Sequence, residues 1–216
     1  AMEIAEREPT GCVIASANPH MAHVIAMLLA QDPFTVAMVS SDYIGVPIAG
    51  ALKNAYAIGA GILDGLGMKY NAKALYITRS NAEISAIGLK LGAEKETLSG
   101  VAGVGDLMLS CVGPSRNRRV GEGIAQGKTL DQVVSEMREV AEGVPTTRAV
   151  YTLADQHDML KYMPILRCIY GVLYEGLEIH DALKKLMSLP VATEHFACDV
   201  VNDILSSPNP DQPQQQ

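Results

Sequence analysis

Lys53 stands in an apolar, glycine-rich stretch, IAGALKNAYAIGAG, where a charged side chain is unusual. A charge is costly to bury in such surroundings, and a desolvated lysine can donate or accept a proton near neutral pH. Glycines in the same stretch would let a ligand or a second backbone approach closely. The alternative is a lysine whose stem follows the helix surface until its ammonium reaches water. The pattern leaves both roles open.

Asp106 lies in a second apolar stretch, VAGVGDLMLSC, which holds no other acid. A carboxylate there needs a cation or several hydrogen-bond donors. One role is the N-cap of a helix that begins just after it. The other is a contact with Lys53 in the folded chain, in which the carboxylate holds the ammonium in position. In that second role the two residues would form an acid–base pair.

Three arginines fall within four positions of VGPSRNRRVGEG, residues 112–123, although the chain carries a net charge of −7. A Gly-Pro pair breaks the chain there and leaves Ser115, Arg116 and Asn117 as a polar trio. Hydroxyl, guanidinium and amide donors together suit a phosphate group. The segment is therefore a candidate anion site.

The same segment also fits a solvated basic loop ahead of a helix, in which Glu122 offsets part of the charge. We interpret Arg118 and Arg119 as background charge that need not touch a ligand. In VAEGVPTT, residues 140–147, Glu142 fits a turn and helix cap by pattern alone. The five histidines lack ligand spacing such as HxxxH, so we assign none of them to a metal.

Composition narrows the class of protein. With 48% hydrophobic residues in 216, the chain can bury a sizeable core. Its 17 basic and 24 acidic residues argue against general affinity for nucleic acid, which requires a basic face. Four cysteines without CxxC spacing and a start without signal-peptide features predict reduced thiols and a cytoplasmic protein, with upstream organellar targeting left open. The apolar run at 44–63, interrupted by Lys53, Asn54 and glycines, is not expected to span a membrane.

The first part of the chain predicts one β-α-β unit. Residues 10–16 and 35–39 have strand character, and residues 20–30 a helical pattern with Asn18 as its N-cap. Two short strands rarely form a stable sheet alone. We therefore interpret residues 1–44 as the C-terminal remnant of a Rossmann-type dinucleotide-binding sheet, and a first residue other than Met suggests a natural start further upstream.

Beyond this unit strand signals fade, and helical segments follow one another with Gly, Asn or Pro between them. We expect a mainly α fold, with an all-helical domain over residues 45–205 and a disordered tail, SSPNPDQPQQQ, over residues 206–216. The expected helices span residues 46–64, 72–91, 130–137, 147–156, 164–174, 181–187 and 192–205. Capping signals support several of them: Asn71, Gly92, and Thr129 with Gln132.

Five motifs occur in order along the chain: GALKN (50–54), NAKALYITR (71–79), AGVGDLMLSC (102–111), SRNRRVGEG (115–123) and VAEGVPTTRAVY (140–151). Together they resemble the NAD(P)-dependent glycerol-3-phosphate dehydrogenases, over about residues 1–187. The resemblance implies a 6-phosphogluconate-dehydrogenase-like helical substrate domain, NAD or NADP as cofactor, and a homodimer. The implied reaction interconverts dihydroxyacetone phosphate and sn-glycerol 3-phosphate by hydride transfer.

The resemblance also implies roles for individual residues. Hydride reduction of a ketone leaves an alkoxide that needs a proton, and the lysine of the LKN motif acts at that C2 oxygen. The implied site residues are Lys53 and Asp106 as catalytic groups, Ser110, Ser115, Arg116 and Asn117 as substrate-binding groups, and Arg116, Val140 and Glu142 as cofactor contacts.

The chain departs from the family pattern in two ways. The loop between Asp106 and Ser115 is one residue shorter than in many bacterial relatives. The glycine-rich first half of the nucleotide fold, with its phosphate-binding lysine, is missing, and the chain has no GxGxxG. We therefore expect a truncated chain that binds cofactor poorly and is nearly inactive alone.

Two other functions stay open as hypotheses. A β-hydroxyacid or ketopantoate-type dehydrogenase shares the same architecture, but the SRN trio favours a phosphorylated substrate. A non-catalytic phosphate-binding or dimerisation module derived from the family would keep the helical domain without turnover. The choice between NAD and NADP depends on residues that follow the second strand of the nucleotide fold, which the chain does not contain.

Overall fold

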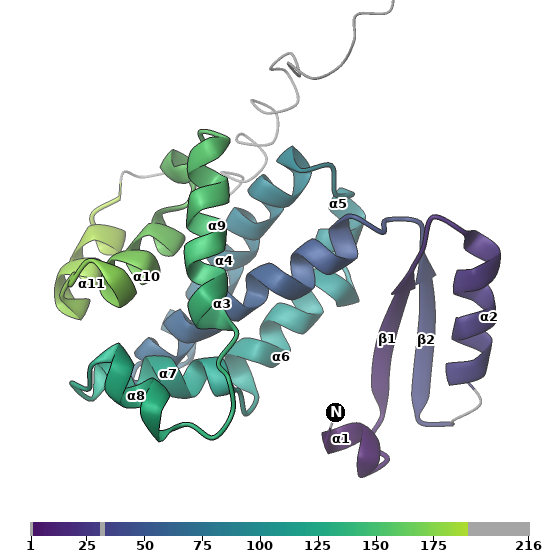
Figure 1. Cartoon of the computed structure of the whole chain (residues 1–216), viewed down its shortest axis with the longest axis horizontal. Helices are drawn as coiled ribbons and strands as arrows, with labels where there is room; N and C mark the ends of the chain where they lie inside the picture. The colour runs from purple at the N-terminus through teal and green to yellow at the C-terminus, as the bar shows by residue number, and fades with distance from the viewer. Residues whose placement is uncertain (1, 31–32, 190–216) are drawn as a thin grey trace, which may run out of the picture.

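A small β-α-β unit lies at one end of the molecule (Figure 1). The computed structural model describes residues 2–30 and 33–189. Strands β1 (Thr10–Ala15) and β2 (Thr35–Ser40) pair in parallel, α2 (Pro19–Leu29) connects them, and α1 (Met2–Ala5) precedes them. The side chain of Asn18 accepts the backbone N–H groups of His20 (3.0 Å) and Met21 (3.2 Å), so the predicted unit and its N-cap are confirmed.

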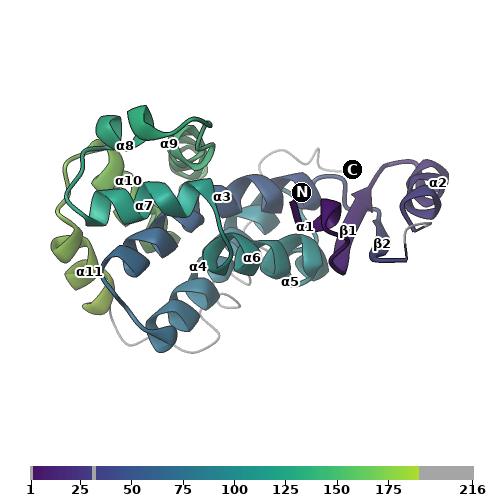
Figure 2. The same ribbon diagram turned by 90° about the horizontal axis from the view of Figure 1, so that it is seen from below.

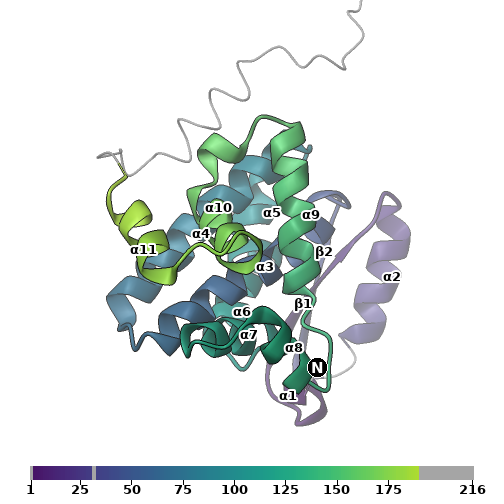
Figure 3. The same ribbon diagram turned by 60° about the vertical axis from the view of Figure 1, so that its left-hand side comes forward.

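The rest of the described chain is helical, and Figure 2 shows it as a separate mass beside the sheet. Helix α3 runs through its centre, with Tyr56 and Ile58 fully buried. Figure 3 shows α9 and α10 close to α3 from another side. The helical elements are α3 (Gly45–Gly65), α4 (Tyr70–Lys90), α5 (Lys95–Ser99), η1 (Val101–Gly105), α6 (Asp106–Val112), α7 (Arg116–Ala125), α8 (Leu130–Glu136), α9 (Gly143–Gln156), η2 (Leu160–Tyr162), α10 (Pro164–Tyr174) and α11 (Ile179–Met187).

The mainly α fold class and most predicted helices are confirmed, whereas four elements between residues 95 and 125 were missed. Their short lengths, and the glycines of η1 and α7, obscure the helical period. The Thr129 capping box is present, and Gly92 follows α4 with a φ of +94°, as a helix-ending glycine does. Asn71 was wrong as a cap, because α4 begins at Tyr70 with Lys69 before it. The helix predicted at 192–205 and the tail at 206–216 lie outside the described residues.

Helix α3 is continuous over 21 residues and, by length and hydropathy alone, could cross a membrane. The interruptions expected to shorten it therefore do not do so. In its most apolar window, 61% of the residues are buried inside the fold. Core helices of folded domains are apolar on all sides for this reason. Its apolar character is accounted for by packing against α4, α6, α7 and α9.

Two glycines allow α3 and α7 to cross at very short distance. A Cβ on Gly121 would lie 2.6 Å from the backbone nitrogen of Ile62, and one on Gly61 would lie 2.7 Å from the carbonyl carbon of Arg118. Side-chain carbons do not approach backbone atoms so closely, so any larger residue at either position would push the helices apart. The crossing places α7 directly against the helix that carries Lys53.

Asp42 joins the end of β2 to the helical part. Its carboxylate accepts the backbone N–H groups of Gly45 (2.6 Å) and Glu94 (2.8 Å). Burial by itself would raise the pKa of Asp42, but these backbone donors outweigh it and lower the pKa below the ordinary value. The chain therefore enters α3 through a bonded junction and not through a free linker.

A buried carboxyl, Glu83 of α4, connects α3 to the start of α10. It accepts the backbone N–H groups of Ile165 (2.7 Å) and Leu166 (3.1 Å) and the hydroxyl of Tyr56 (3.0 Å). The first N–H groups of a helix have no acceptor within it, so Glu83 supplies one. Burial raises the pKa of Glu83 from 4.5 to about 8 in spite of these donors.

Candidate active site

Lys53 and Asp106 form an ion pair between α3 and α6. The contact proposed from the sequence is therefore present, and the alternative of Asp106 as an N-cap is wrong, because α6 begins at Asp106 and Gly105 precedes it. The side chains are 20% and 31% exposed, so each group keeps a path to a ligand. An ammonium beside a carboxylate at a partly open surface is suited to proton transfer.

The turn before α6 is π-helical and leads directly to Asp106. Residues Val101–Gly105 form one turn of π-helix, η1, which leads directly into α6. Single π-turns interrupt the regular helix and are frequent at functional sites. Ser110 follows Asp106 by four residues and lies on the same face of α6, with its side chain half-buried. The two polar groups of α6 therefore share one face.

The predicted trio does not act as a single exposed group. Ser115 is the N-cap residue of α7, and its hydroxyl makes no capping bond. Arg116 is 47% exposed, with Nε 3.6 Å from a carboxylate oxygen of Glu139. Asn117 is buried at 7% exposure. Successive helix residues point about 100° apart, which separates Arg116 from Asn117.

Asn117 connects three helices through Asn54, a residue that the sequence interpretation had not assigned to the site. Its amide nitrogen donates to Asn54 Oδ1 (3.1 Å), and its oxygen accepts the backbone N–H of Gly143 (2.9 Å). Asn54 directly follows Lys53, and this position within LKN was the available signal. The amide bridge fixes α7 against α3 at the residue next to the ion pair.

Val140 and Glu142 lie in the connection that leads into α9. Val140 is 72% exposed. Glu142 occupies the N-cap position of α9, as the pattern predicted, but its side chain makes no capping bond. The ion pair between Arg116 and Glu139 brings the arginine beside this connection. The structure therefore places the Arg116 guanidinium beside the segment that holds Val140 and Glu142, the two residues to which the family resemblance gave a cofactor contact.

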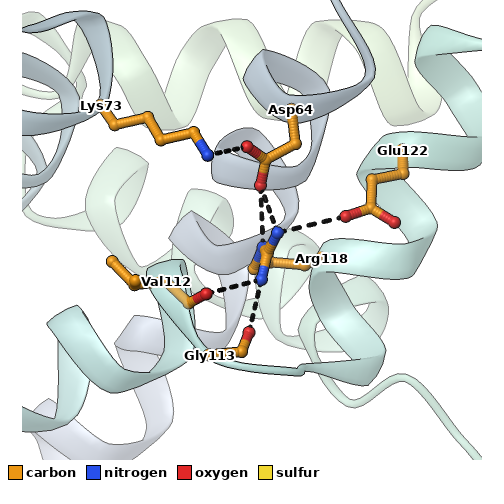
Figure 4. A network of polar contacts seen from close by, with 6 residues as sticks. All are labelled: Asp64, Lys73, Val112, Gly113, Arg118 and Glu122. Carbon is orange, nitrogen blue, oxygen red and sulfur yellow. Dashed lines mark hydrogen bonds and ion pairs between the residues drawn. The ribbon is translucent and has the colours of Figure 1, made fainter. Parts of the chain in front are cut away.

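Arg118 was wrongly interpreted as background charge. Its guanidinium donates to Asp64 (Nε to Oδ2, 2.9 Å) and to the carbonyl oxygens of Val112 (2.8 Å) and Gly113 (2.5 Å), and its Nη2 also approaches Glu122 (3.3 Å) (Figure 4). The side chain is only 16% exposed. The partner of Glu122 is thus a bonded guanidinium, and the segment is not a simple solvated basic loop. Arg119 is exposed.

Cys111 lies on α6 with Asp106, but its thiol is buried. Burial raises the pKa of the Cys111 thiol to about 12, so it stays protonated and unreactive at neutral pH. Within residues 2–30 and 33–189, no group of three His, Cys, Asp or Glu side chains could hold a metal. Two surface hollows lie against α9, α10 and α11. The candidate site is therefore assigned from the positions of polar and charged side chains on α3, α6 and α7, and not from a metal cluster or a surface hollow.

Comparison with known proteins defines the class to which this arrangement belongs. A family described as NAD-dependent glycerol-3-phosphate dehydrogenase C-terminus matches residues 42–184. This range contains α3, α6 and α7 with the ion pair, the amide bridge and Arg118. The chain belongs to this family.

Relatives of known name cover most of the chain. A glycerol-3-phosphate dehydrogenase [NAD(P)+] of Geobacter sulfurreducens is 43% identical over 91% of the chain, and one of Salinibacter ruber is 42% identical over 91%. A crystal structure of glycerol-3-phosphate dehydrogenase from Coxiella burnetii superposes with a TM-score of 0.80 and 33% identity over 87% of the chain and 57% of that structure. The chain spans 58% and 57% of the lengths of the first two relatives.

Proposed function

We propose that this chain forms the substrate-binding and proton-transferring part of an NAD(P)-dependent glycerol-3-phosphate dehydrogenase, which interconverts dihydroxyacetone phosphate and sn-glycerol 3-phosphate. The observation that carries the proposal is the Lys53–Asp106 ion pair, partly exposed and set beside the polar residues of α7. The names of the relatives support the same reaction. Because the chain spans little more than half of their length, the complete activity belongs to the whole protein.

Lys53 is the proton donor when the ketone is reduced. The carbonyl carbon gains a hydride, its oxygen becomes an alkoxide, and the ammonium of Lys53 gives that oxygen a proton. In the oxidation direction the neutral amine takes the proton back. The carboxylate of Asp106 holds the ammonium at the edge of α3, where the substrate oxygen can reach it. Asn117 holds Asn54 by a hydrogen bond, and Asn54 is the neighbour of Lys53 on α3, so this bond helps to keep Lys53 in place.

The phosphate group of the substrate binds at the start of α7. Ser115 has a hydroxyl that is not used for capping, and Arg116 has a half-exposed guanidinium. A guanidinium fork matches phosphate oxygens in geometry and charge. Glu139 holds Arg116 only loosely, at 3.6 Å, so an incoming dianion competes for it readily. Asn117 acts here by orienting the helix.

The described residues fit part of a dinucleotide site. NAD(P), when bound, supplies or accepts the hydride. The exposed guanidinium of Arg116 would bind a polar or charged group of the cofactor, and exposed Val140 would contact an apolar face, with Glu142 beside it. The outer surfaces of α2 and β2 expose Met27 (61%) and Val36 (64%), which supports further sheet structure packing there in the whole protein.

Ligand titration tests the proposal. We expect the chain to bind dihydroxyacetone phosphate and sn-glycerol 3-phosphate in calorimetric titrations, and to bind glycerol or ketopantoate far more weakly. Arg116→Met should abolish the preference for the phosphorylated compounds, whereas Arg119→Met, which removes the same charge from an exposed position, should not. Equal affinity for glycerol and sn-glycerol 3-phosphate would contradict the phosphate site, and preferential binding of ketopantoate would favour the hydroxyacid dehydrogenases.

Turnover is tested in a fusion that adds the part of the Geobacter relative outside the matched region. We expect the fusion to oxidise NADH with dihydroxyacetone phosphate, and the isolated chain to be nearly inactive. Tight binding of sn-glycerol 3-phosphate without turnover in the fusion would favour the non-catalytic module. The family resemblance also implies a homodimer, which light scattering of the purified chain tests directly.

A further inference from the structure

We infer that Arg118 is a positioning residue, which holds the helices of the site in the arrangement that a phosphorylated substrate requires. The inference rests on the proposed function for the identity of that substrate. The geometry of the guanidinium, by contrast, is independent of any reaction. Arg118 contacts none of the groups assigned to the chemistry, and it acts through the backbone that carries them.

The guanidinium of Arg118 first closes the C-terminal end of α6. Its Nη1 donates to the carbonyl oxygens of Val112 (2.8 Å) and Gly113 (2.5 Å). The last carbonyls of a helix have no donor within it, so an arginine at this place satisfies groups that would otherwise need water. Asp106 and Ser110 both lie on this seven-residue helix. Fixing its end therefore fixes the two polar residues of α6.

The opposite edge of the same guanidinium holds the C-terminal end of α3. Nε donates to Oδ2 of Asp64 (2.9 Å), and Nη2 pairs with the same carboxylate. Lys73 of α4 pairs with the other carboxylate oxygen of Asp64 (Figure 4). Two cations near the end of α3 also suit the negative end of its dipole. The helix that bears Lys53 is thus tied to α6 through one planar group.

The third connection is the position of Arg118 itself on α7, directly after Asn117. The Gly113–Pro114 turn joins α6 to α7. Arg118 lies on α7 after this turn, and its guanidinium reaches back to the carbonyl oxygen of Gly113 before it. Ser115 and Arg116 lie between the two residues that this hydrogen bond joins. A guanidinium has donors fixed in a plane and can serve carbonyls on one edge and a carboxylate on the other, which an ammonium cannot do. The arrangement predicts that the turn keeps its shape only with arginine at 118.

Four variants separate positioning from charge and from stability. Arg118→Met removes the planar set of guanidinium donors together with the charge, whereas Arg118→Lys keeps the charge but not the planar donors. Arg119→Met removes an equal charge from an exposed position of the same helix. Lys73→Met breaks the Asp64 cluster at its other end and leaves the Gly113 turn bonded. The thermal unfolding midpoints of all four variants are measured first, and the later experiments are done at a temperature at which every variant is folded.

Hydrogen exchange of the full 216-residue chain is the first readout. The N–H of Gly113 donates to Leu109 (2.9 Å) and reports the end of α6, and that of Arg119 donates to Ser115 (3.1 Å) and reports the start of α7. We expect both amides to exchange at least about tenfold faster than in wild type in Arg118→Met. The increase in exchange rate should be smaller in Arg118→Lys. Arg119→Met and Lys73→Met should leave both amides close to wild type. Equal exchange in Arg118→Met and Lys73→Met would overturn the inference, because the cluster would then act only through stability.

Affinity for sn-glycerol 3-phosphate is the second readout. We expect Arg118→Met to weaken binding by about tenfold to a hundredfold, with Lys73→Met and Arg119→Met within about twofold of wild type. Wild-type affinity in Arg118→Lys would show that the fork is not needed and would contradict the inference. If the wild-type chain binds no phosphorylated ligand, the proposed function and the substrate part of the inference fail together, while the exchange rates still decide whether Arg118 shapes the turn.

Discussion

Two charged clusters contact α3, and they differ in how completely their groups are bonded. Near the middle of the helix, Lys53 pairs with Asp106, and the side chains are 20% and 31% exposed. At its C-terminal end, Asp64 is 13% exposed and pairs with both Arg118 and Lys73. A partly exposed pair can exchange a proton with a ligand, whereas a fully bonded cluster holds its neighbours in place. On the proposed function, the same helix thus carries a reactive charge near its middle and a structural charge at its end.

The largest effect is expected from the reactive cluster. In the fusion with the part of the Geobacter relative outside the matched region, Lys53→Met should lower kcat for dihydroxyacetone phosphate reduction by about 10²–10⁴, because the alkoxide loses its proton donor. The unfolding midpoint should change little, since a partly exposed ammonium is replaced by an apolar chain of similar length. Retained turnover in this variant would remove Lys53 from the mechanism.

Glu83 differs from both charged clusters, because its buried carboxyl is held by backbone N–H groups and a hydroxyl, which are uncharged donors. Burial raises its pKa from 4.5 to about 8. The unfolded chain loses the proton near pH 4.5 and the folded chain near 8, so the stability linked to Glu83 is present below about pH 4.5 and is lost as pH rises through 8. Urea unfolding followed by circular dichroism should show this loss, on the order of a few kcal/mol.

The control for this pH dependence is Glu83→Gln, whose amide does not titrate. Its unfolding free energy should be nearly flat between about pH 5 and 8, although lower in absolute value, since the amide nitrogen cannot accept from Leu166 or Tyr56. A slope that persists unchanged in the amide variant would assign the titration to another group. Far-ultraviolet measurement suits a chain that has no tryptophan.

The structural cluster should lose more stability than the reactive one when a carboxylate is neutralised. Asp64→Asn should lower the unfolding free energy by about 1–3 kcal/mol, because Lys73 loses its carboxylate partner and Arg118 keeps only Glu122 as a charged partner. Asp106→Asn, at a more exposed pair, should cost less than about 1 kcal/mol. Denaturation midpoints of the two variants test the contrast directly. Equal losses would show that exposure does not separate the clusters.

The smallest effect is expected at a residue that belongs to neither cluster. Thr129→Ala removes a capping box in which Thr129 Oγ1 accepts the N–H of Gln132 (3.2 Å) and the Gln132 side chain accepts that of Thr129 (2.9 Å). The expected loss is about 1 kcal/mol, with affinity for sn-glycerol 3-phosphate unchanged. This variant calibrates how much stability can be lost without disturbing the site. Weakened binding here would mean that stability alone accounts for the effects assigned to Arg118.

Local signals predicted most elements of the fold. Asn18 and the Thr129 capping box marked helix starts, and the apolar pattern predicted α3 almost to its ends. The elements between residues 95 and 125 escaped, because a π-turn and short helices carry no long period. These are the elements that carry Asp106, Ser110 and the SRN residues. The part of the chain closest to the candidate site was therefore the least predictable.

The sequence by itself determined the β-α-β unit and most of the long helices, and it marked Lys53 and Asp106 as charges in costly surroundings. Only the tertiary structure decided that the two form an ion pair, that Asn117 faces inward to Asn54, and that Arg118, unlike exposed Arg119, is bonded. Capping and periodicity act over a few residues, whereas these contacts join residues more than fifty positions apart. The contacts of Asn117 and Arg118 with α3 also depend on Gly61 and Gly121, which let α3 and α7 meet almost backbone to backbone.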